Sequence, residues 1–408
     1  MRKVLKNILK ILAVLTLKKY QPGVIGITGS AGKTSTKEAI YAVLKQERII
    51  RRNKGNFNNE LGLPLTILSD AEKISGILFW PKIIIKAIGR LIFSDKNYPE
   101  VLILEMAADR PGDIKYLTDI AKPHIGVITA IGDIPVHVEF YSSPEAVARE
   151  KAHLIEILPV NGFAVLNYDD EIIYNLRSRT RAHLITYGFN DGADLKLSNL
   201  EYRVEDDKPV GISFKIQYGG SFVPIRLNDV FGRPQAYAAG AAVAVGLAFG
   251  MNLVKISEGF SEYEAPEHRM KMIEGVKATL ILDDSYNASP LSMRSALNTL
   301  DDLPAKRKIA VLGDMLEIGK YSTEAHEAIG ETVVKIVDYL FCVGPRAKFI
   351  AESARRHGFD HKKIQVFSSS DAAKKMIERE IKSGDLILIK GSRAIQLEKI
   401  IEEIKITK

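Results

Sequence analysis

The glycine-rich stretch at residues 23–36 constrains this chain more than any other feature. Its apolar, β-branched start stops at Gly29, and helix-forming residues follow from Lys37. This pattern predicts a strand, a tight turn and a helix start, where backbone N–H groups and the helix dipole bind a polyphosphate. Lys33 is expected to reach the β- and γ-phosphates, and the Thr34 hydroxyl to ligate Mg²⁺. An ordinary Gly-Ser turn is the alternative, but the flanking strand and helix favour phosphate binding. The predicted nucleotide loop comprises Gly29, Ser30, Ala31, Gly32, Lys33, Thr34 and Ser35.

Charge in this chain is concentrated in two segments. The 408 residues carry a net charge of +7, and their number predicts two or three domains with large cores. Residues 1–22 contain six basic and no acidic side chains, and residues 74–98 contain four basic and one acidic. The remainder is slightly acidic, which argues against a nucleic-acid binder. The single cysteine, Cys342, excludes an internal disulfide and fits a reducing compartment.

Both basic segments read as amphipathic helices. The apolar face predicted for a helix over residues 3–17 consists of Leu5, Ile8, Leu9, Leu12 and Leu15. Within residues 74–93, Lys82, Lys86 and Arg90 recur on one helical stripe. Both segments are too charged to span a bilayer. Two interpretations stay open. In the first, which we favour, the helices cover apolar surface of the neighbouring domain. In the second, they form a platform on an anionic membrane surface.

Two buried strands are expected to end beside the predicted loop. The strand pattern at residues 101–105 ends in a carboxylate, and the carboxyl ends of parallel strands face the ligand crevice. Glu105 should therefore lie near the phosphates. A second strand at 125–129 leads into a loop that contains His137, and the next predicted helix carries Lys151 on its second turn.

The loop at residues 53–64 is dense in asparagine and follows the nucleotide loop closely. Asn56, Asn58 and Asn59 lie within it. Asparagines often cap turns. A substrate-binding loop is at least as good an interpretation of this density.

The rest of the chain predicts one small antiparallel sheet and a second α/β unit. Residues 184–230 alternate in polarity, which predicts the antiparallel sheet. Strands are expected at 278–283, 308–312, 339–343 and 385–390, and helices near 291–301, 322–337, 345–357, 371–382 and 393–405. This alternation predicts a doubly wound parallel sheet. Polar clusters lie at predicted strand ends, at residues 283–287, 313–317 and 390–393. Each could simply cap the helix that follows. Because three such clusters are expected at the same edge of the sheet, a functional site is the other interpretation.

Together these motifs resemble the Mur ligase superfamily of ATP-dependent, amide-forming enzymes of peptidoglycan synthesis. The segments that carry the resemblance are 28–34, 56–65, 283–290, 311–319 and 390–393. The sequences Asp-Asp-Ser-Tyr-Asn and Gly-Asp-Met-Leu-Glu favour the branch that adds D-alanyl-D-alanine to a muramoyl-peptide. The fold implied is α/β: a P-loop ATPase-type parallel-sheet domain with a small antiparallel sheet, then a Rossmann-like domain. Its expected parts are a basic helix at 1–22, an ATP-binding domain at 23–264 with an insertion at 74–98, and a C-terminal domain at 265–408.

The resemblance implies roles for matching positions. ATP and two Mg²⁺ ions are the expected cofactors, with the ions held by Thr34, Glu105, His137 and a carbamylated Lys151. Lys33, Lys151, His137 and Glu105 are the expected catalytic residues. Arg269, Asp284 and Gln235 would contact the nucleotide. The residues expected on the two other substrates are Asn56, Asn58, Asn59, Tyr286, Asn287, Asp314, Glu317, Lys390, Ser392 and Arg393.

This chain departs from the family pattern at four places. Only 22 residues precede the phosphate-binding domain, so the family's N-terminal UDP-binding domain is expected to be missing. The usual Glu-x-Gly reads Glu-Met-Ala at residues 105–107, followed by Gly-Asp-Ile at 112–114. The loop before His137 is two residues longer, and the adenine-side His-Asn pair reads Pro234-Gln235.

The leading hypothesis is a monomeric cytoplasmic ligase that adds D-alanyl-D-alanine to a muramoyl-peptide through an acyl phosphate, with peripheral contact to an anionic membrane as an option. The alternatives are another amide ligase of this superfamily with a different acceptor, and a catalytically weak ATP-binding scaffold. Retention of Lys33, Thr34, Glu105, His137 and Lys151 favours an enzyme.

Overall fold

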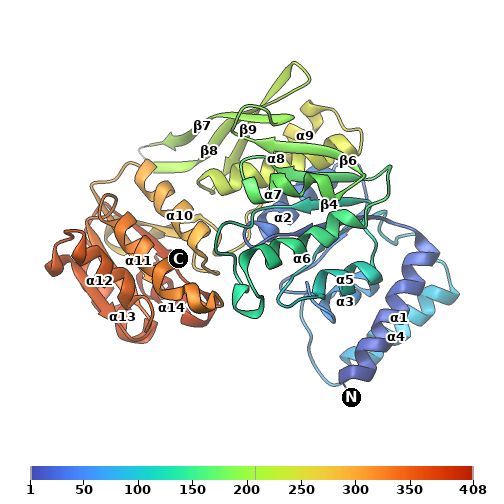
Figure 1. Cartoon of the computed structure of the whole chain (residues 1–408), viewed down its shortest axis with the longest axis horizontal. Coiled ribbons are helices and arrows are strands. Elements are labelled where there is room, and N and C mark those ends of the chain that lie inside the picture. The colour runs from blue at the N-terminus through green and yellow to red at the C-terminus, as the bar shows by residue number, and fades with distance from the viewer. Residues whose placement is uncertain (1, 207, 407–408) are drawn as a thin grey trace.

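The computed structural model describes residues 2–206 and 208–406, and within these ranges two β-sheets are each flanked by helices (Figure 1). The larger sheet has nine strands in the order β2-β3-β1-β4-β5-β6-β7-β8-β9. The smaller sheet has six strands in the order β10-β11-β15-β12-β13-β14. The chain therefore forms two α/β units, as the alternation of strands and helices predicts.

The elements of the first unit begin and end as follows. Its strands are β1 (Gly23–Thr28), β2 (Ile50–Arg52), β3 (Val101–Glu105), β4 (Ile125–Ile128), β5 (Phe163–Asn167), β6 (His183–Gly188), β7 (Leu195–Glu205), β8 (Lys208–Tyr218) and β9 (Ser221–Asn228). Its helices are α1 (Arg2–Tyr20), α2 (Lys33–Leu44), α3 (Gly62–Leu68), α4 (Phe79–Ile92), α5 (Asp113–Ile120), α6 (Pro144–Glu156), α7 (Glu171–Asn175), α8 (Arg233–Ala248) and α9 (Leu253–Gly259).

Strands β1 to β6 are parallel, and β1 lies at the centre between β3 and β4. The central strands β1, β3, β4 and β5 are short, mainly apolar runs because both faces of the sheet are covered there. On one face α2 and the alanine-rich α8 pack on Ile25, Ile27 and Ile103. On the other face α1, α3 and α5 pack on Leu102 and Leu104. Because β1, β3 and β4 end at the same edge, the loops that carry the predicted site residues meet there.

The antiparallel part is an extension of this sheet. Strand β7 pairs in parallel with β6 over two residues and in an antiparallel ladder with β8, which in turn pairs antiparallel with β9. The burial pattern of β9 alternates from Phe222 onward, because one face covers the core and the other faces solvent. The predicted small antiparallel sheet therefore exists, but it continues the parallel sheet.

The second unit follows η3 (Phe260–Glu262). Its strands are β10 (Lys271–Gly275), β11 (Thr279–Asp283), β12 (Arg307–Gly313), β13 (Tyr339–Val343), β14 (Ile364–Phe367) and β15 (Asp385–Lys390). Its helices are α10 (Pro290–Asp302), α11 (Ser322–Val333), α12 (Lys348–Arg356), α13 (Ser370–Glu380) and α14 (Glu398–Ile404). Strands β11 to β15 pair in parallel, and β10 adds an antiparallel edge to β11. The sequence pattern missed β10 and β14, which are the two edge strands.

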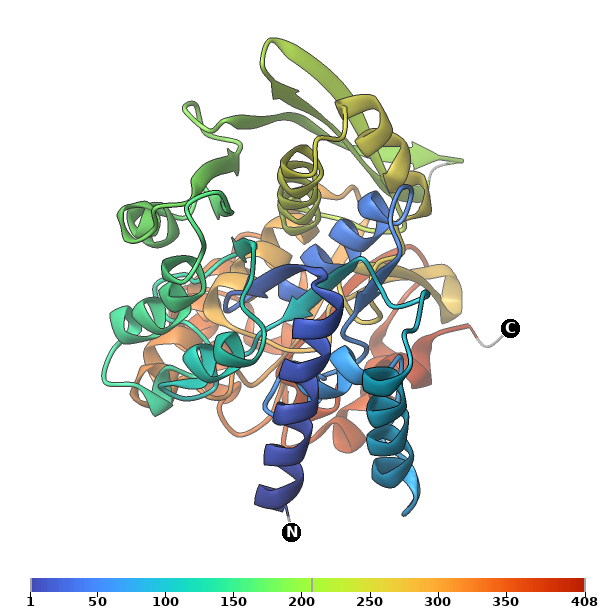
Figure 2. The same ribbon diagram turned by 90° about the vertical axis from the view of Figure 1, so that its right-hand side faces the viewer.

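Helices α1 and α4 lie side by side at one end of the first unit (Figure 2). The predicted apolar face of α1 is only partly right. Leu9 and Leu12 are buried with Ala13, whereas Ile8 and Leu15 are exposed. The helix is apolar on nearly all sides, so its sequence period does not select the buried side. No helix within the described ranges is long and apolar enough to cross a lipid bilayer.

Candidate active site

The turn between β1 and α2 leaves the first amides of α2 free of side-chain caps. Gly32 precedes the helix with φ of 84°, and it provides no side-chain cap for the helix N-terminus. The buried Ser30 hydroxyl has no hydrogen-bond partner among the described residues. An uncapped helix N-terminus with an unsatisfied hydroxyl beside it fits an anion such as a phosphate.

The shape of this loop depends on Thr129, at the end of the neighbouring strand. Its hydroxyl donates to Ala31 O at 2.6 Å, with Thr28 O at 3.2 Å. A Cβ at Gly29 would lie only 2.1 Å from the same hydroxyl oxygen, and Gly29 has φ of 150°. The Thr129 hydroxyl that holds the loop therefore leaves no room for a side chain at position 29.

Lys33, Thr34 and Glu105 converge at the start of α2. The Lys33 ammonium donates to Gly29 O at 2.8 Å, which places it inside the loop, and burial lowers its pKa. The Thr34 hydroxyl donates to Glu105 Oε2 at 3.2 Å. A hydroxyl and a carboxylate next to a phosphate loop are oxygen ligands suited to Mg²⁺.

Lys151 on α6 is fully buried beside this group. Burial, and secondarily the charge of Lys33, lowers the pKa of Lys151 to about 7. A large fraction of this amine is therefore neutral near pH 7. The carboxylate of the adjacent Glu150 accepts from Gly112 N and Ile114 N at the start of α5.

His137 reaches across to the second unit. Its Nε2 lies 3.3 Å from Asp109 Oδ1, and its Nδ1 lies 3.0 Å from Glu317 Oε2. The buried Nδ1 has no well-directed hydrogen bond among the described residues, although it lies close to the Glu317 carboxylate. The interaction lowers the pKa of Glu317. His137 thus links the two units in this structure.

The three asparagines of the predicted substrate loop have different contacts. Asn58 Nδ2 donates to Glu105 Oε1 at 3.1 Å, and Asn56 accepts from the Tyr286 hydroxyl of the second unit. Asn59 Oδ1 accepts from Gly62 N at 3.0 Å, which caps α3. Asn59 therefore has a turn-stabilising role, and the substrate-binding role of the loop stays a prediction.

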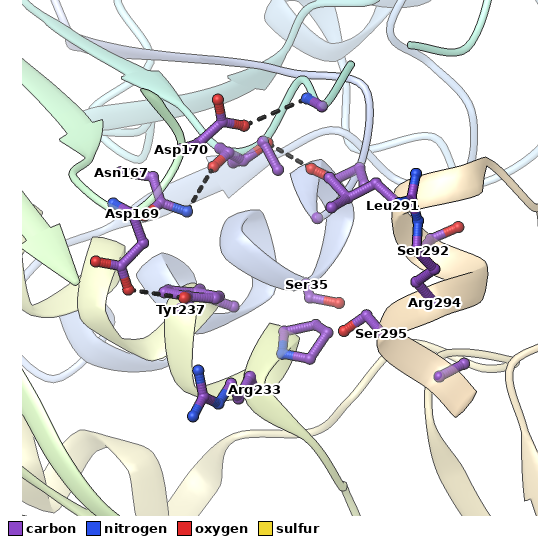
Figure 3. A pocket seen from close by; sticks show the side chains of 18 of the residues that line it. Ser35, Asn167, Asp169, Asp170, Arg233, Tyr237, Leu291, Ser292, Arg294 and Ser295 are labelled. Atoms are coloured by element: carbon purple, nitrogen blue, oxygen red, sulfur yellow. Dashed lines mark hydrogen bonds between the residues drawn. The ribbon is translucent and has the colours of Figure 1, made fainter. Parts of the chain in front are cut away.

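A cavity of about 680 Å³ opens between the two units in front of the phosphate loop. Figure 3 shows Leu291, Ser292, Arg294 and Ser295 of α10 facing Ser35, Asn167, Asp169, Asp170, Arg233 and Tyr237 of the first unit. The Tyr237 hydroxyl donates to Asp169 Oδ2 at 2.7 Å. The cavity thus has one wall from each unit.

Gln235 lies at this cavity, but its amide is already engaged. Its Oε1 accepts from the Tyr263 hydroxyl at 2.8 Å, and its Nε2 donates to Arg269 O at 3.1 Å. Gln235 therefore ties α8 to the segment that leads into the second unit. Arg269 also lines the cavity, and its guanidinium lies 4.1 Å from the centre of the Tyr286 ring.

The clusters of the second unit converge at the strand ends. Lys390 Nζ donates to Asp284 Oδ2 at 2.5 Å and to Asn287 O at 2.9 Å. Burial raises the pKa of Asp284 and lowers that of Lys390, while their mutual attraction opposes both changes. Both side chains line the cavity, which brings two of the three predicted clusters to it.

The remaining predicted residues of this unit make mainly backbone contacts. Asp314 Oδ1 accepts from Arg346 N and Ala347 N, and Ser392 Oγ accepts from Leu316 N. The Arg393 guanidinium lies 5.7 Å from the Tyr286 ring centre. These contacts position the loops at the sheet edge.

Asp109 was not predicted from the sequence, although it lies beside His137 and its charge acts on both Lys33 and Lys151. Asp109 follows Glu105 by four residues, so it lies in the loop after the same strand, where acidic residues near the phosphates are expected. Among the described residues no three His, Cys, Asp or Glu side chains form a metal cluster. The Thr34 hydroxyl and the Glu105 carboxylate fit Mg²⁺ as they stand, whereas Lys151 would be a ligand for Mg²⁺ only if it carried an acidic group.

Comparisons with known proteins agree with this arrangement. The model of the Mur ligase middle domain matches residues 27–79 and 87–246, and that of the Mur ligase glutamate ligase domain matches 268–393. The UDP-N-acetylmuramoyl-tripeptide–D-alanyl-D-alanine ligase of Bacillus subtilis is 31% identical over 96% of this chain and 78% of the relative. The structure of MurF ligase from Thermotoga maritima in complex with ADP has a TM-score of 0.80 at 29% identity, covering 98% of this chain and 83% of that one. Folylpolyglutamate synthase of Mycobacterium tuberculosis shares the fold alone, with a TM-score of 0.67 at 17% identity over 97% and 94% of the two chains.

Proposed function

The chain belongs to the Mur ligase family, and from this premise we propose that it is an ATP-dependent ligase that joins D-alanyl-D-alanine to a muramoyl-tripeptide precursor of peptidoglycan. One observation carries the proposal. The phosphate loop of the first unit and the Asp284–Lys390 pair of the second line the same cavity, so a nucleotide bound there would contact both units.

The proposed reaction has two steps. A carboxylate oxygen of the tripeptide attacks the γ-phosphorus of ATP, a new P–O bond forms, the bond to the β-phosphate breaks, and ADP leaves. The neutral amine of D-alanyl-D-alanine, which has lost a proton to solvent, then attacks the acyl carbon. A C–N bond forms, the bond to the phosphate breaks, and the second amine proton is released.

The charged side chains around the loop favour the first step. Both the γ-phosphoryl group and the carboxylate are anions, so they approach only where cations offset their repulsion. Lys33 lies in the loop to contact the phosphates, while Arg269 and Lys390 supply positive charge from the second unit. Contact between the two units would also exclude water that hydrolyses an acyl phosphate.

We also propose that two Mg²⁺ ions bind here. Thr34 and Glu105 would hold one, and His137 and a carbamate on Lys151 the other, with Asp109 beside them. When bound, Mg²⁺ supplies positive charge to the phosphate and carboxylate oxygens. The lowered pKa of Lys151 supports the carbamate, because only the neutral amine attacks CO₂. That attack forms an N–C bond and releases one proton to solvent.

The carbamate has a direct test. Stripping CO₂ from the buffer should lower activity, and bicarbonate should restore it. Lys151→Ala should be inactive and partly recovered by acetate, which supplies the missing carboxylate. A parent protein that is fully active with an unmodified Lys151, as judged by mass and CO₂ dependence, would exclude this role.

The substrate assignment is tested by ADP release and product mass. Turnover should require ATP, the UDP-linked tripeptide and D-alanyl-D-alanine together, and the product should contain the new amide. Turnover only with another acceptor or amine would identify a different ligase of this family. Nucleotide binding without turnover for any combination would identify a scaffold.

We further propose that the chain acts as a monomer in the cytoplasm. Both walls of the cavity come from one chain, and ATP is the energy source. Light scattering at the assay concentration tests the first point, since a dimeric mass would contradict it. Cell fractionation tests the second.

A further inference from the structure

Helices α1 and α4 form a paired layer on the outside of the first unit (Figure 2). They run side by side with their C-terminal ends together, because Lys19 Nζ donates to Arg90 O and Leu91 O, and the Tyr20 hydroxyl donates to Arg90 O. Both pack on the short helix α3. Each helix therefore has one side packed on the domain and an exposed, outer side.

The outer side of α1 is an aliphatic stripe. Val4, Ile8, Ile11 and Leu15 are all exposed and follow helical spacing. The core of the domain uses the opposite side, where Leu9 and Leu12 are buried. A helix packed on a soluble domain needs one apolar side. The exposed aliphatic stripe is therefore not needed to pack α1 on the domain.

The outer side of α4 repeats this arrangement. Leu78, Ile85, Ile88 and Ile92 are exposed at the same spacing, while Ile83 and Ala87 are buried. Ile77 and Phe93 at the two ends are 93% and 74% exposed. We call the exposed outer sides of α1 and α4 the helical face. Extended apolar surfaces of this kind on monomers mark binding sites.

Charge on the helical face has one sign. Helix α1 contains six basic residues and α4 contains three, and neither contains Asp or Glu. Some of these cations are used internally: Arg90 pairs with Asp95, and Lys6 and Lys10 lie over the ring of Tyr116. Lys82 and Lys86 are exposed next to the aliphatic stripe of α4. The face thus combines aliphatic side chains with a lysine border.

We propose that the helical face docks the protein onto an anionic lipid bilayer. Aliphatic side chains at helical spacing enter the interfacial region, and flanking lysines extend their ammonium groups to the headgroups. A second copy of this chain is a poorer partner, because two such faces would bring only like charges together. Neither helix is able to span the bilayer, so the contact is peripheral.

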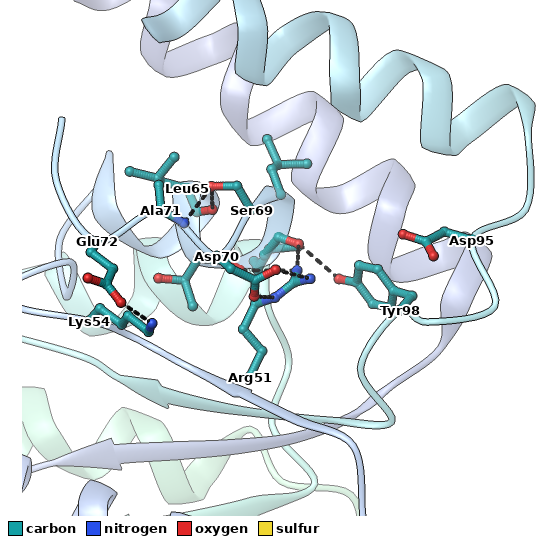
Figure 4. Close-up of polar contacts among 12 residues, drawn as sticks. Arg51, Lys54, Leu65, Ser69, Asp70, Ala71, Glu72, Asp95 and Tyr98 are labelled. Carbon is teal, nitrogen blue, oxygen red and sulfur yellow. Dashed lines mark hydrogen bonds and ion pairs between the residues drawn. The ribbon is translucent and has the colours of Figure 1, made fainter. Parts of the chain in front are cut away.

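Helix α3, on which α1 and α4 pack, is tied to the sheet and to the asparagine loop. Figure 4 shows Arg51 of β2 close to Asp70 and Tyr98. Arg51 donates to Asp70 Oδ1 and to Ile67 O near the end of α3, and the Tyr98 hydroxyl donates to the same carbonyl. Helix α3 itself follows the asparagine loop that contacts Glu105. Docking would therefore orient the asparagine loop relative to the membrane without involving the nucleotide cavity.

The test is co-sedimentation with vesicles of phosphatidylcholine alone or mixed with phosphatidylglycerol, at low and high salt. The parent should sediment only with the mixed vesicles, and less at high salt. Lys82→Gln with Lys86→Gln should weaken binding about thirtyfold. Lys362→Gln with Lys363→Gln, two exposed lysines of the second unit, should leave it unchanged.

The aliphatic contribution is tested by Ile85→Ser with Ile88→Ser, against Val254→Ser, an exposed position on α9. The first should abolish binding and the second should not. ADP release with soluble substrates should stay at the parent rate in all these variants, which shows that they fold. Failure of the parent to bind mixed vesicles at low salt, equal loss in the control variants, or self-association through this face would overturn the proposal, whatever the outcome for ligase activity.

Discussion

Replacing Lys33 by Met tests the phosphate loop most directly. The Lys33 ammonium lies inside the loop at 2.8 Å from Gly29 O and is fully buried, so little solvent screens its charge. One charge about 4 Å from a phosphoryl charge, at an effective dielectric constant of about 20, contributes roughly 4 kcal/mol. A loss of about 3–4 kcal/mol from the transition state lowers kcat about 100- to 1,000-fold. Met keeps most of the packing.

The assay is ADP release at saturating substrates, together with ATP affinity by calorimetry and the thermal midpoint without nucleotide. Because burial lowers the pKa of Lys33, the charged form of this side chain destabilises the folded protein when no nucleotide is bound. The midpoint of Lys33→Met should therefore equal or exceed that of the parent. Lys45→Met, at the other end of α2, is the matched control and should keep full activity. A Lys33→Met enzyme within tenfold of the parent rate would refute the assignment of the loop.

Two further predictions concern glycine and histidine positions. Gly29→Ala should reduce ligation more than tenfold and destabilise the fold by about 1–3 kcal/mol, because the new Cβ would lie 2.1 Å from the Thr129 hydroxyl. Gly89→Ala, a helical position with open space, should instead stabilise by roughly 0.5–1 kcal/mol, and calorimetry distinguishes the two. The hydrogen bond that His268 Nδ1 donates to Asp283 Oδ2 raises the pKa of His268, so its stabilisation is complete below about pH 6.5 and is lost as the pH rises through the raised pKa. The difference in thermal midpoint between the parent and His268→Gln should thus be larger at about pH 5.5 than at about pH 8.5, and equal differences would contradict this reasoning.

The centre of each sheet could be predicted from the sequence, and the edges could not. Buried parallel strands such as β3 and β12 are uninterrupted apolar runs between turn residues, which identifies them locally. The edge strands β10 and β14 are partly exposed and mixed in polarity, so nothing local separates them from loops. The last predicted helix divides into η7 (Arg393–Ile395) and α14, because Gln396 has φ of 58°.

The candidate site was predictable where the chemistry depends on neighbouring residues in the sequence. The nucleotide loop and Glu105 follow from strand, turn and helix order. The contact of His137 with Glu317 depends on how the two units approach each other, and no local pattern encodes that. The engagement of Gln235 by Tyr263 and by the backbone of Arg269 is likewise a tertiary contact.

The contact between Thr129 and the phosphate loop limits how the loop can be mutated or transferred to another protein. One hydroxyl on β4's end holds the carbonyl of Ala31 and occupies the space that a side chain at Gly29 would need. The loop's shape is therefore encoded at two places about a hundred residues apart. A mutational library limited to the loop leaves Thr129 unchanged. It would therefore recover only loop sequences that are compatible with Thr129. Grafting the loop onto another scaffold would transfer its amides without the residue that orients them.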